Sequence, residues 1–248
     1  MPVDHHLRAP SLLRKAVAET LGTALLLLAV IGSGIAAQRL SPGDAGLELF
    51  ENAVATGCAL AVIILALGPV SGAHLNPAVS LVDAALGGLG RRELLAYITA
   101  QIGGAVVGVI VANLMFSLAP VSLSVHLRSG PGLWLGEVVA TFGLLLVIFG
   151  ITRSGRSTVV PFAVGAYITG AYFFTSSTSF ANPAVTLART LSNTFSGISP
   201  ASVVPFIAAE LCGAAIAWVA IRYLHPDARE IAEVVVVPHG SISEETAS

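Results

Sequence analysis

The sequence predicts an all-α membrane protein with six transmembrane helices, two re-entrant half-helices that enter the membrane without crossing it, and an inverted repeat. Composition is the first reason: of 248 residues, 55% are hydrophobic and 10% are charged, whereas an ordinary soluble domain carries about 25% charged residues. The second reason is a set of six long apolar runs. The third is an Asn-Pro-Ala-Val motif that occurs twice.

The composition also limits what the protein can do. Charged residues are too few to cover a soluble core of this size, so most of the surface must face lipid. A net charge of -2 offers no basic face for nucleic acid. The sequence has no Ser/His/Asp set, phosphate loop or metal-ligand spacing. We therefore expect that the protein is not an enzyme and binds no metal or cofactor. Cys58 and Cys212 lie inside apolar runs and are expected to be small buried hydrophobic residues.

The membrane spans can be counted from the apolar runs, because about 20 residues cross a hydrocarbon core about 30 Å thick. The six runs are 16–37, 53–67, 94–118, 133–151, 158–175 and 203–221. Six crossings put both chain ends on one side of the membrane, and most Lys and Arg residues fall on that side, which is then the cytoplasm. We therefore expect a multi-pass protein of the cell inner (plasma) membrane with polar cytoplasmic tails at 1–13 and 227–248.

Two further apolar segments are too short to span the membrane. Residues 68–87 contain a helical part of about ten residues, which rises about 15 Å, half of the hydrocarbon core. The same pattern returns at residues 177–191. The motif residues of the two segments are Asn76, Pro77 and Ala78 in the first, and Asn182, Pro183 and Ala184 in the second.

The Asn-Pro-Ala triplet has a direct physical interpretation as a helix start. Asn is a favoured N-cap, and Pro suits the first helical position because its missing N–H would be unpaired there. If the Asn carbonyl oxygen accepts a backbone N–H, the Asn amide group stays free to donate outward. Two helix starts that meet near the midplane would also repel cations. The loops before the two motifs are therefore candidates for a pore wall.

The chain divides into two copies of one arrangement. Residues 14–118 form the first repeat and residues 133–224 the second, and each is predicted as helix, helix, half-helix, helix. Because each repeat has an odd number of spans, the second copy is inverted relative to the first. In that arrangement a substrate path lies at the interface between the repeats.

Glu19 and Glu137 open the first and fourth spans at matching positions. A charge near the bilayer centre costs at least about 2.5 to 3.5 kcal/mol, so both carboxyl groups need partners. They either anchor the irregular loops before the two motifs or relay protons, and the anchor is favoured because those loops leave backbone groups to be paired. Further polar and small positions in the spans are Gln101 and Glu210, with similar interpretations, and Gly104 and Gly213, which fit close helix packing.

Residues 71–79, Ser-Gly-Ala-His-Leu-Asn-Pro-Ala-Val, resemble the signature of the aquaporin, or major intrinsic protein, family. The second motif, the two glutamates and the inverted halves extend the resemblance over roughly residues 14–224. The resemblance implies an aquaporin-like right-handed bundle, a passive pore in every subunit, a homotetramer and no cofactor. The chain is then a single channel domain over residues 1–248.

The resemblance also implies an outer selectivity filter of four positions. Counted from the two motifs, they are Thr56, Gly170, Ser179 and Val185. The family usually carries an arginine at the position of Val185, and a water-selective filter usually has an aromatic residue and a histidine at the positions of Thr56 and Gly170. All four residues here are small or medium-sized and uncharged, so we expect a wider opening that admits solutes larger than water.

With Val185 in place of that arginine, the sequence is similar to a bacterial subgroup of the family associated with arsenic detoxification. This implies that arsenite and related uncharged metalloid acids pass together with water and glycerol-like polyols. Arg189 lies four residues further on the same helix face, about 6 Å along the axis. It either places a positive charge in the outer vestibule or pairs with backbone carbonyls or lipid headgroups.

An ion-coupled secondary transporter is the alternative function, since inverted repeats and broken helices occur in that class as well. It would need Glu19 or Glu137 to bind the coupling ion. His74 is expected to present its backbone and not its imidazole to the pore, and Asp83 is expected to face cytoplasmic water. The predicted partners are small neutral solutes and membrane lipid, with no nucleic acid.

Overall fold

The computed structural model describes residues 10–225, and the regular secondary structure of that part is helical. The helices are α1 (Leu12–Leu40), α2 (Ala45–Ser71), α3 (Pro77–Leu86), α4 (Arg91–Met115), α5 (Pro131–Arg153), α6 (Val160–Phe174), α7 (Pro183–Ala188) and α8 (Pro200–Leu224), with short 3-10 helices η1 (Ser157–Val159) and η2 (Arg189–Leu191). The predicted tail at 227–248 and the first nine residues of the predicted tail at 1–13 lie outside the described residues, whereas α1 already begins at Leu12, inside the predicted N-terminal tail.

Within residues 10–225, six helices are long and apolar enough to cross a membrane: α1, α2, α4, α5, α6 together with η1, and α8. Each overlaps one predicted span, so the predicted number and order of spans are confirmed. The largest difference is at α2, which begins at Ala45 and not at residue 53. Asp44 caps it by accepting a hydrogen bond from Leu47 N at 3.0 Å, and the acidic first turns continue the helix beyond its apolar part.

The two repeats pack in the same way. In the first repeat α1 packs along α4 and α2, and in the second α5 packs along α8 and α6, while α2 and α6 join the repeats. Glycines allow the close approach: a Cβ on Gly104 would overlap the Thr20 carbonyl oxygen, and a Cβ on Gly213 would overlap that of Val138. The predicted close-packing roles of Gly104 and Gly213 are confirmed.

Replacing Gly104 with Val should prevent α4 from packing along α1. The added side chain meets backbone, which cannot move aside, and overpacking of this kind costs roughly 1–3 kcal/mol or more. Gly103 on the same helix provides the control, because a Cβ there meets nothing within 4 Å. In detergent, Gly104→Val should lose most of its monodisperse size-exclusion peak, and Gly103→Val should keep it. Equal behaviour of the two variants would contradict the packing described here.

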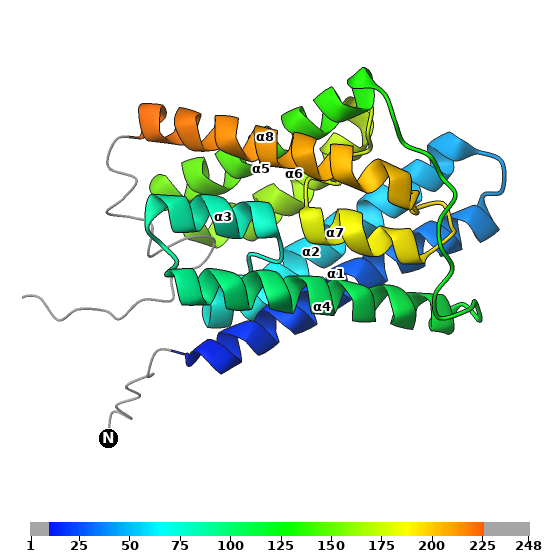
Figure 1. The fold of residues 1–248 in the computed structure, drawn as a ribbon, viewed down its shortest axis with the longest axis horizontal. Coiled ribbons are helices and arrows are strands. Elements are labelled where there is room, and N and C mark those ends of the chain that lie inside the picture. The colour runs from blue at the N-terminus through cyan, green and yellow to red at the C-terminus, as the bar shows by residue number, and fades with distance from the viewer. Residues whose placement is uncertain (1–9, 226–248) are drawn as a thin grey trace, which may run out of the picture.

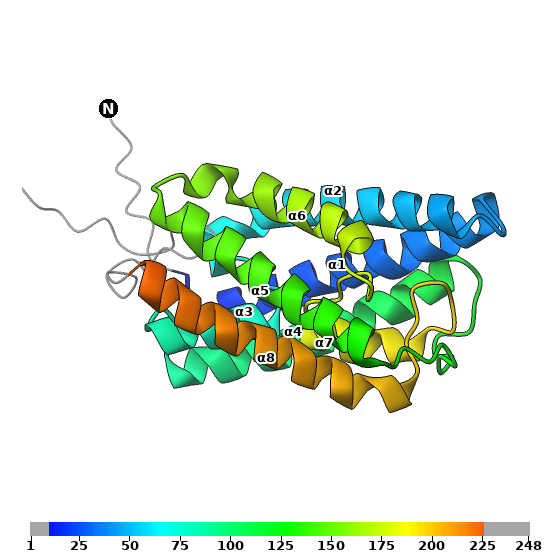
Figure 2. The same cartoon turned by 90° about the horizontal axis from the view of Figure 1, so that it is seen from above.

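The half-helices α3 and α7 lie end to end across the middle of the bundle (Figure 1). Their N-terminal ends face each other, and the two helices run toward opposite ends of the molecule. The start of α1 and the end of α8 lie at the same end (Figures 1 and 2). This is the predicted architecture of six spans, two half-helices and an inverted repeat.

The outside of the bundle is apolar. Large side chains such as Val62 and Val204 are 63% and 76% exposed, which fits a surface that faces lipid. Cys58 and Cys212 are both exposed as well. The prediction that these cysteines are buried is therefore wrong: an apolar run in a membrane helix has an outer face as well as an inner one.

Candidate functional site

Both half-helices begin with a capping asparagine followed by proline. Asn76 Oδ1 accepts a hydrogen bond from Ala78 N at 2.8 Å, and Asn182 Oδ1 accepts from Ala184 N at 3.0 Å. Pro77 and Pro183 occupy the first helical position, where a missing N–H costs nothing. The triplets therefore start the two half-helices as their sequence predicts.

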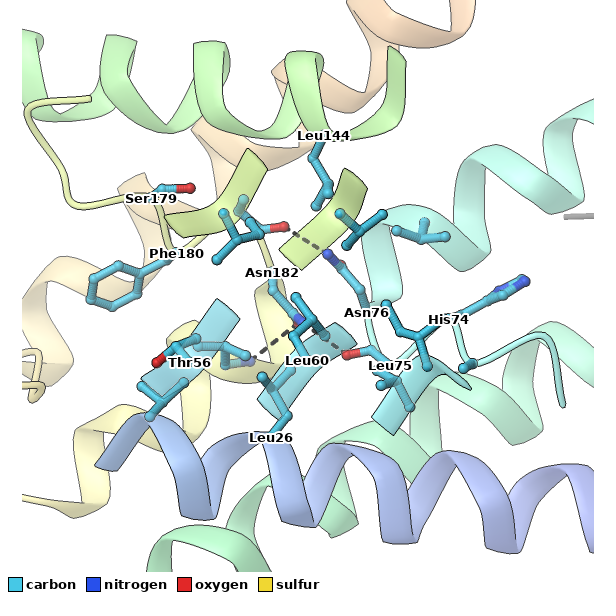
Figure 3. Close-up of a pocket in the computed structure, with 18 of the residues that line it drawn as sticks. Leu26, Thr56, Leu60, His74, Leu75, Asn76, Leu144, Ser179, Phe180 and Asn182 are labelled. Atoms are coloured by element: carbon cyan, nitrogen blue, oxygen red, sulfur yellow. Dashed lines mark hydrogen bonds between the residues drawn. The ribbon is translucent and has the colours of Figure 1, made fainter. Parts of the chain in front are cut away.

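The two asparagines also connect the repeats. Asn76 Nδ2 donates to Ala181 O at 2.7 Å, and Asn182 Nδ2 donates to Leu75 O at 2.8 Å (Figure 3). The prediction of amide groups wholly free to donate outward is therefore wrong in part. Each amide nitrogen carries two hydrogens, so one N–H of each asparagine ties the half-helix tips together and the other takes no part in that hydrogen bond.

The loops before the asparagines have a matching, unusual backbone. Leu75 and Ala181 both lie in the left-handed region, with φ of 53° and 50°, a conformation that costs a residue with a side chain roughly 1–3 kcal/mol. In both repeats this residue supplies the carbonyl oxygen that accepts the hydrogen bond from the opposite asparagine. The strain therefore serves to aim a carbonyl oxygen at the meeting point of the two half-helices.

Glu19 holds the first of these loops. Its Oε1 accepts from Ser71 Oγ at 2.7 Å and from His74 N at 3.0 Å, and its Oε2 accepts from Leu75 N and Gln101 Nε2, each at 2.7 Å. Both carboxylate oxygens are thus occupied by donors, and the side chain is fully buried. These contacts match the anchor interpretation of Glu19 and not the proton relay.

Glu137 and Glu210 hold the corresponding loop of the second repeat. Glu137 accepts from Phe180 N at 2.9 Å and from Ala181 N at 2.7 Å. Glu210 Oε1 accepts from Asn182 N at 3.3 Å and from Thr186 Oγ1 at 2.5 Å. The inner loops of the two repeats are therefore fixed by buried acidic side chains at equivalent places.

A cavity runs past the half-helix tips, and Figure 3 shows its lining. Asn76 and Asn182, one from the start of each half-helix, both line it. Much of the remaining wall is apolar, with Leu26, Leu60 and Leu144 among its residues. Glu19 and Glu137 are not part of this lining. The cavity therefore combines a few fixed polar groups with a wall that binds solutes weakly.

Three of the four predicted filter residues line this cavity: Thr56, Ser179 and Val185. The structure does not bring Gly170 to it, because Gly170 lies on the exposed face of α6 beside Phe174. The α6 residue beside Thr56 is Tyr172, whose hydroxyl donates to Thr56 Oγ1 at 3.4 Å. Two residues turn an α-helix by about 200°, so a count that is wrong by two selects the opposite face.

Arg189 lies against the cavity and not beyond it. Its side chain is 2% exposed, and it is among the residues that line the cavity. The guanidinium carbon is 3.5 Å from the centre of the Phe180 ring, and Nε donates to Ser196 O. Side chains on a helix point toward its N-terminus, which brings this guanidinium back toward the level of Phe180. The position of Arg189 on the second half-helix was predicted from the sequence, but no sequence pattern indicated that its side chain would stack on Phe180.

His74 contributes its backbone N–H to Glu19, and its ring points away from Asn76 (Figure 3). The ring Nδ1 is 3.1 Å from Ser80 Oγ, and Nε2 is 3.8 Å from Asp83 Oδ2. Asp83 is 1% exposed, so the expectation that it faces cytoplasmic water is wrong. It lies seven residues after Asn76, which is two helical turns, and therefore shares the buried face of α3.

The fold and the site define a membrane channel: an inverted repeat encloses a cavity, and two half-helix starts meet beside it. The sequence matches the model of the major intrinsic protein family over residues 6–181. The chain belongs to this family, whose members are channels and not enzymes.

Individual relatives agree with that assignment. The chain is 53% identical over 220 residues to aquaglyceroporin AqpS of Rhizobium meliloti, covering 89% of this chain and 94% of that protein. It is 32% identical over 179 residues to the lens fiber major intrinsic protein of Oryctolagus cuniculus, covering 68% of this chain and 65% of that one. A solved structure, the aquaglyceroporin from Plasmodium falciparum, has the same fold, with a TM-score of 0.63, 21% identity, and coverage of 88% of this chain and 99% of that chain.

Proposed function

We propose that the chain is a passive channel for small neutral solutes: water, glycerol-like polyols, and uncharged metalloid acids such as arsenous acid. The observation that carries the proposal is the composition of the filter. Thr56, Ser179 and Val185 line the cavity with small uncharged side chains, and position 185 lacks the arginine that would narrow it. The 53% identical relative is named an aquaglyceroporin, which supports the passage of polyols.

The conduction mechanism uses the polar groups at the half-helix tips. A solute exchanges part of its hydration shell for hydrogen bonds from the remaining N–H of Asn76 and Asn182. Apolar wall residues such as Leu60 and Leu144 keep this binding weak enough for the solute to leave. The two helix starts add positive potential at the same place, which disfavours cations.

The ion-coupled alternative has less support. A coupling ion needs a carboxylate that can release its protein partners, whereas both oxygens of Glu19 accept two hydrogen bonds each. Both oxygens of Glu137 accept from the backbone, and neither glutamate lines the cavity. Their contacts support a fixed structural role in both repeats.

We also propose the membrane in which the channel lies, its oligomeric state and the side on which its termini lie. We place it in the plasma membrane as a homotetramer in which every subunit, a single channel domain, has its own pore and both termini are cytoplasmic. The exposed apolar faces of the bundle supply contacts for lipid and for neighbouring subunits. The two repeats, 14–118 and 133–224, contribute one half-helix each to the pore.

Swelling of proteoliposomes tests the function directly. Vesicles with the purified protein are exposed in turn to gradients of glycerol, arsenous acid and sucrose. Glycerol and arsenous acid should enter roughly tenfold faster than into protein-free vesicles, without saturation or dependence on a proton gradient, while sucrose stays excluded. Entry no faster than in protein-free vesicles would overturn the channel proposal. Entry of glycerol without arsenous acid would overturn the metalloid part alone.

A further inference from the structure

The guanidinium groups of two arginines contact the ring of Phe180 beside the cavity. The guanidinium carbon of Arg189 is 3.5 Å from the centre of this ring, and that of Arg128 is 5.2 Å from the same centre. The ring is 4% exposed and packs edge-on against Phe206 at 5.3 Å. A planar guanidinium stacks favourably on an aromatic face, and more so where water is excluded. The buried ring therefore provides a fixed aromatic face for a guanidinium group.

The two arginines differ in their other contacts and in whether they line the cavity. Arg128 Nε donates to Gly197 O at 3.1 Å, and its Nη2 donates to Phe195 O at 3.3 Å. Its guanidinium thus holds the backbone of the segment 192–199 between η2 and α8, and Arg128 is not among the residues that line the cavity. Arg189, by contrast, lines the cavity together with Phe180. Only this second guanidinium meets the solute pathway.

The position of the ring is fixed independently of Arg189. The backbone N–H of Phe180 donates to the anchor Glu137 at 2.9 Å, and Phe206 on α8 holds the ring from the side. Arg189 follows the last turn of α7, and its Nε donates to Ser196 O. The ring and this carbonyl oxygen therefore hold the guanidinium from two directions.

We propose that Phe180 is a specificity-determining positioning residue, whose ring holds the Arg189 guanidinium at the cavity wall so that this group sets which solutes pass. The inference rests on the proposed channel function. It gives the pore a fixed fork of N–H donors near the filter although position 185 has none. A guanidinium released from the ring would move, and both the width and the donor pattern of the opening would change.

The test is a double-mutant cycle on the ratio of glycerol to water permeability in proteoliposomes. This ratio does not depend on the amount of folded protein, so a merely destabilised variant leaves it unchanged. Arg189→Ala should raise the ratio roughly threefold or more because it removes a bulky group from the wall. Phe180→Leu should change it in the same direction, and Phe180→Tyr, which keeps the aromatic face, should leave it unchanged.

The decisive comparison is Phe180→Leu in the Arg189→Ala background. If the ring acts through the guanidinium, the second change should alter the ratio less than about 1.5-fold, since residues that act as one unit are not additive. The inference is overturned if Phe180→Leu has the same effect in both backgrounds, if either single change leaves the ratio unaltered, or if Phe180→Tyr shifts it as Phe180→Leu does. Where Phe180→Leu gives no folded protein, Phe180→Met is measured in its place. A wild-type protein that passes no glycerol would instead overturn the proposed function.

Discussion

An arginine at position 185 is expected to reduce glycerol and arsenous acid permeability by roughly tenfold or more, which corresponds to about 1.4 kcal/mol of added barrier. Val185 lines the cavity and lies in the first turn of α7, where its backbone N–H donates to Asn182 Oδ1 at 3.3 Å. A guanidinium at this place fills part of the opening and adds fixed donors and a charge. Water, being smaller, should lose less than about threefold.

Val185→Leu is the control that separates size from charge. Leucine adds volume at the same place in the cavity wall but no donors and no charge, so it should reduce glycerol entry less than arginine does. Stopped-flow light scattering of proteoliposomes measures all three proteins at equal protein content. If Val185→Arg leaves every permeability unchanged, position 185 does not belong to the filter, and the assignment of the outer constriction is wrong.

Replacing Glu19 with Gln is expected to destabilise the protein severely. Four donors converge on the two oxygens of Glu19, whereas a glutamine offers one oxygen and one NH₂ group. At least two of these donors would then face another donor, and each unpaired buried polar group costs roughly 1–3 kcal/mol. For two such groups the cost is roughly 2–6 kcal/mol, a large part of the free energy of unfolding of many proteins, which is about 5–15 kcal/mol.

The measurement is the yield and thermal stability of the purified protein in detergent. Glu51→Gln is the matched control, because Glu51 accepts a hydrogen bond from Ser41 at 2.9 Å near the connection between α1 and α2 and is not an anchor. Glu19→Gln should lose most of its folded protein, and Glu51→Gln should behave as wild type. A Glu19→Gln protein of normal stability that has lost proton-driven uptake would support the ion-coupled transporter instead.

The parts of the fold that follow from local chemistry were predictable from the sequence. Both Asn-Pro-Ala triplets have the residue preferences of a helix start, and the short apolar segments after them cannot cross a membrane. The matching positions of Glu19 and Glu137 indicated anchors, because a buried carboxylate in lipid must have donors. The structure contains these donors as the backbone N–H groups of both loops.

Other features depend on side-chain directions that the local sequence does not contain. The asparagine amides donate to carbonyl oxygens more than 100 residues away, and no local pattern identifies those partners. For α6 a usable signal was present, since Val164, Ile168 and Tyr172 are spaced by four residues and line the cavity. This helical stripe would have selected Tyr172, whereas a count from Asn182 selected Gly170.

Thiol block of solute flux tests most directly whether the cavity between the half-helix tips is the conduction path. In a background with Cys58→Ser and Cys212→Ser, cysteine replaces Leu60, which lines the cavity, or Val62, which is 63% exposed on the outside of the same helix. After treatment with a small methanethiosulfonate reagent, glycerol flux through Leu60→Cys should fall roughly tenfold or more, and flux through Val62→Cys should stay unchanged. Undiminished flux through a fully labelled Leu60→Cys protein would contradict the account.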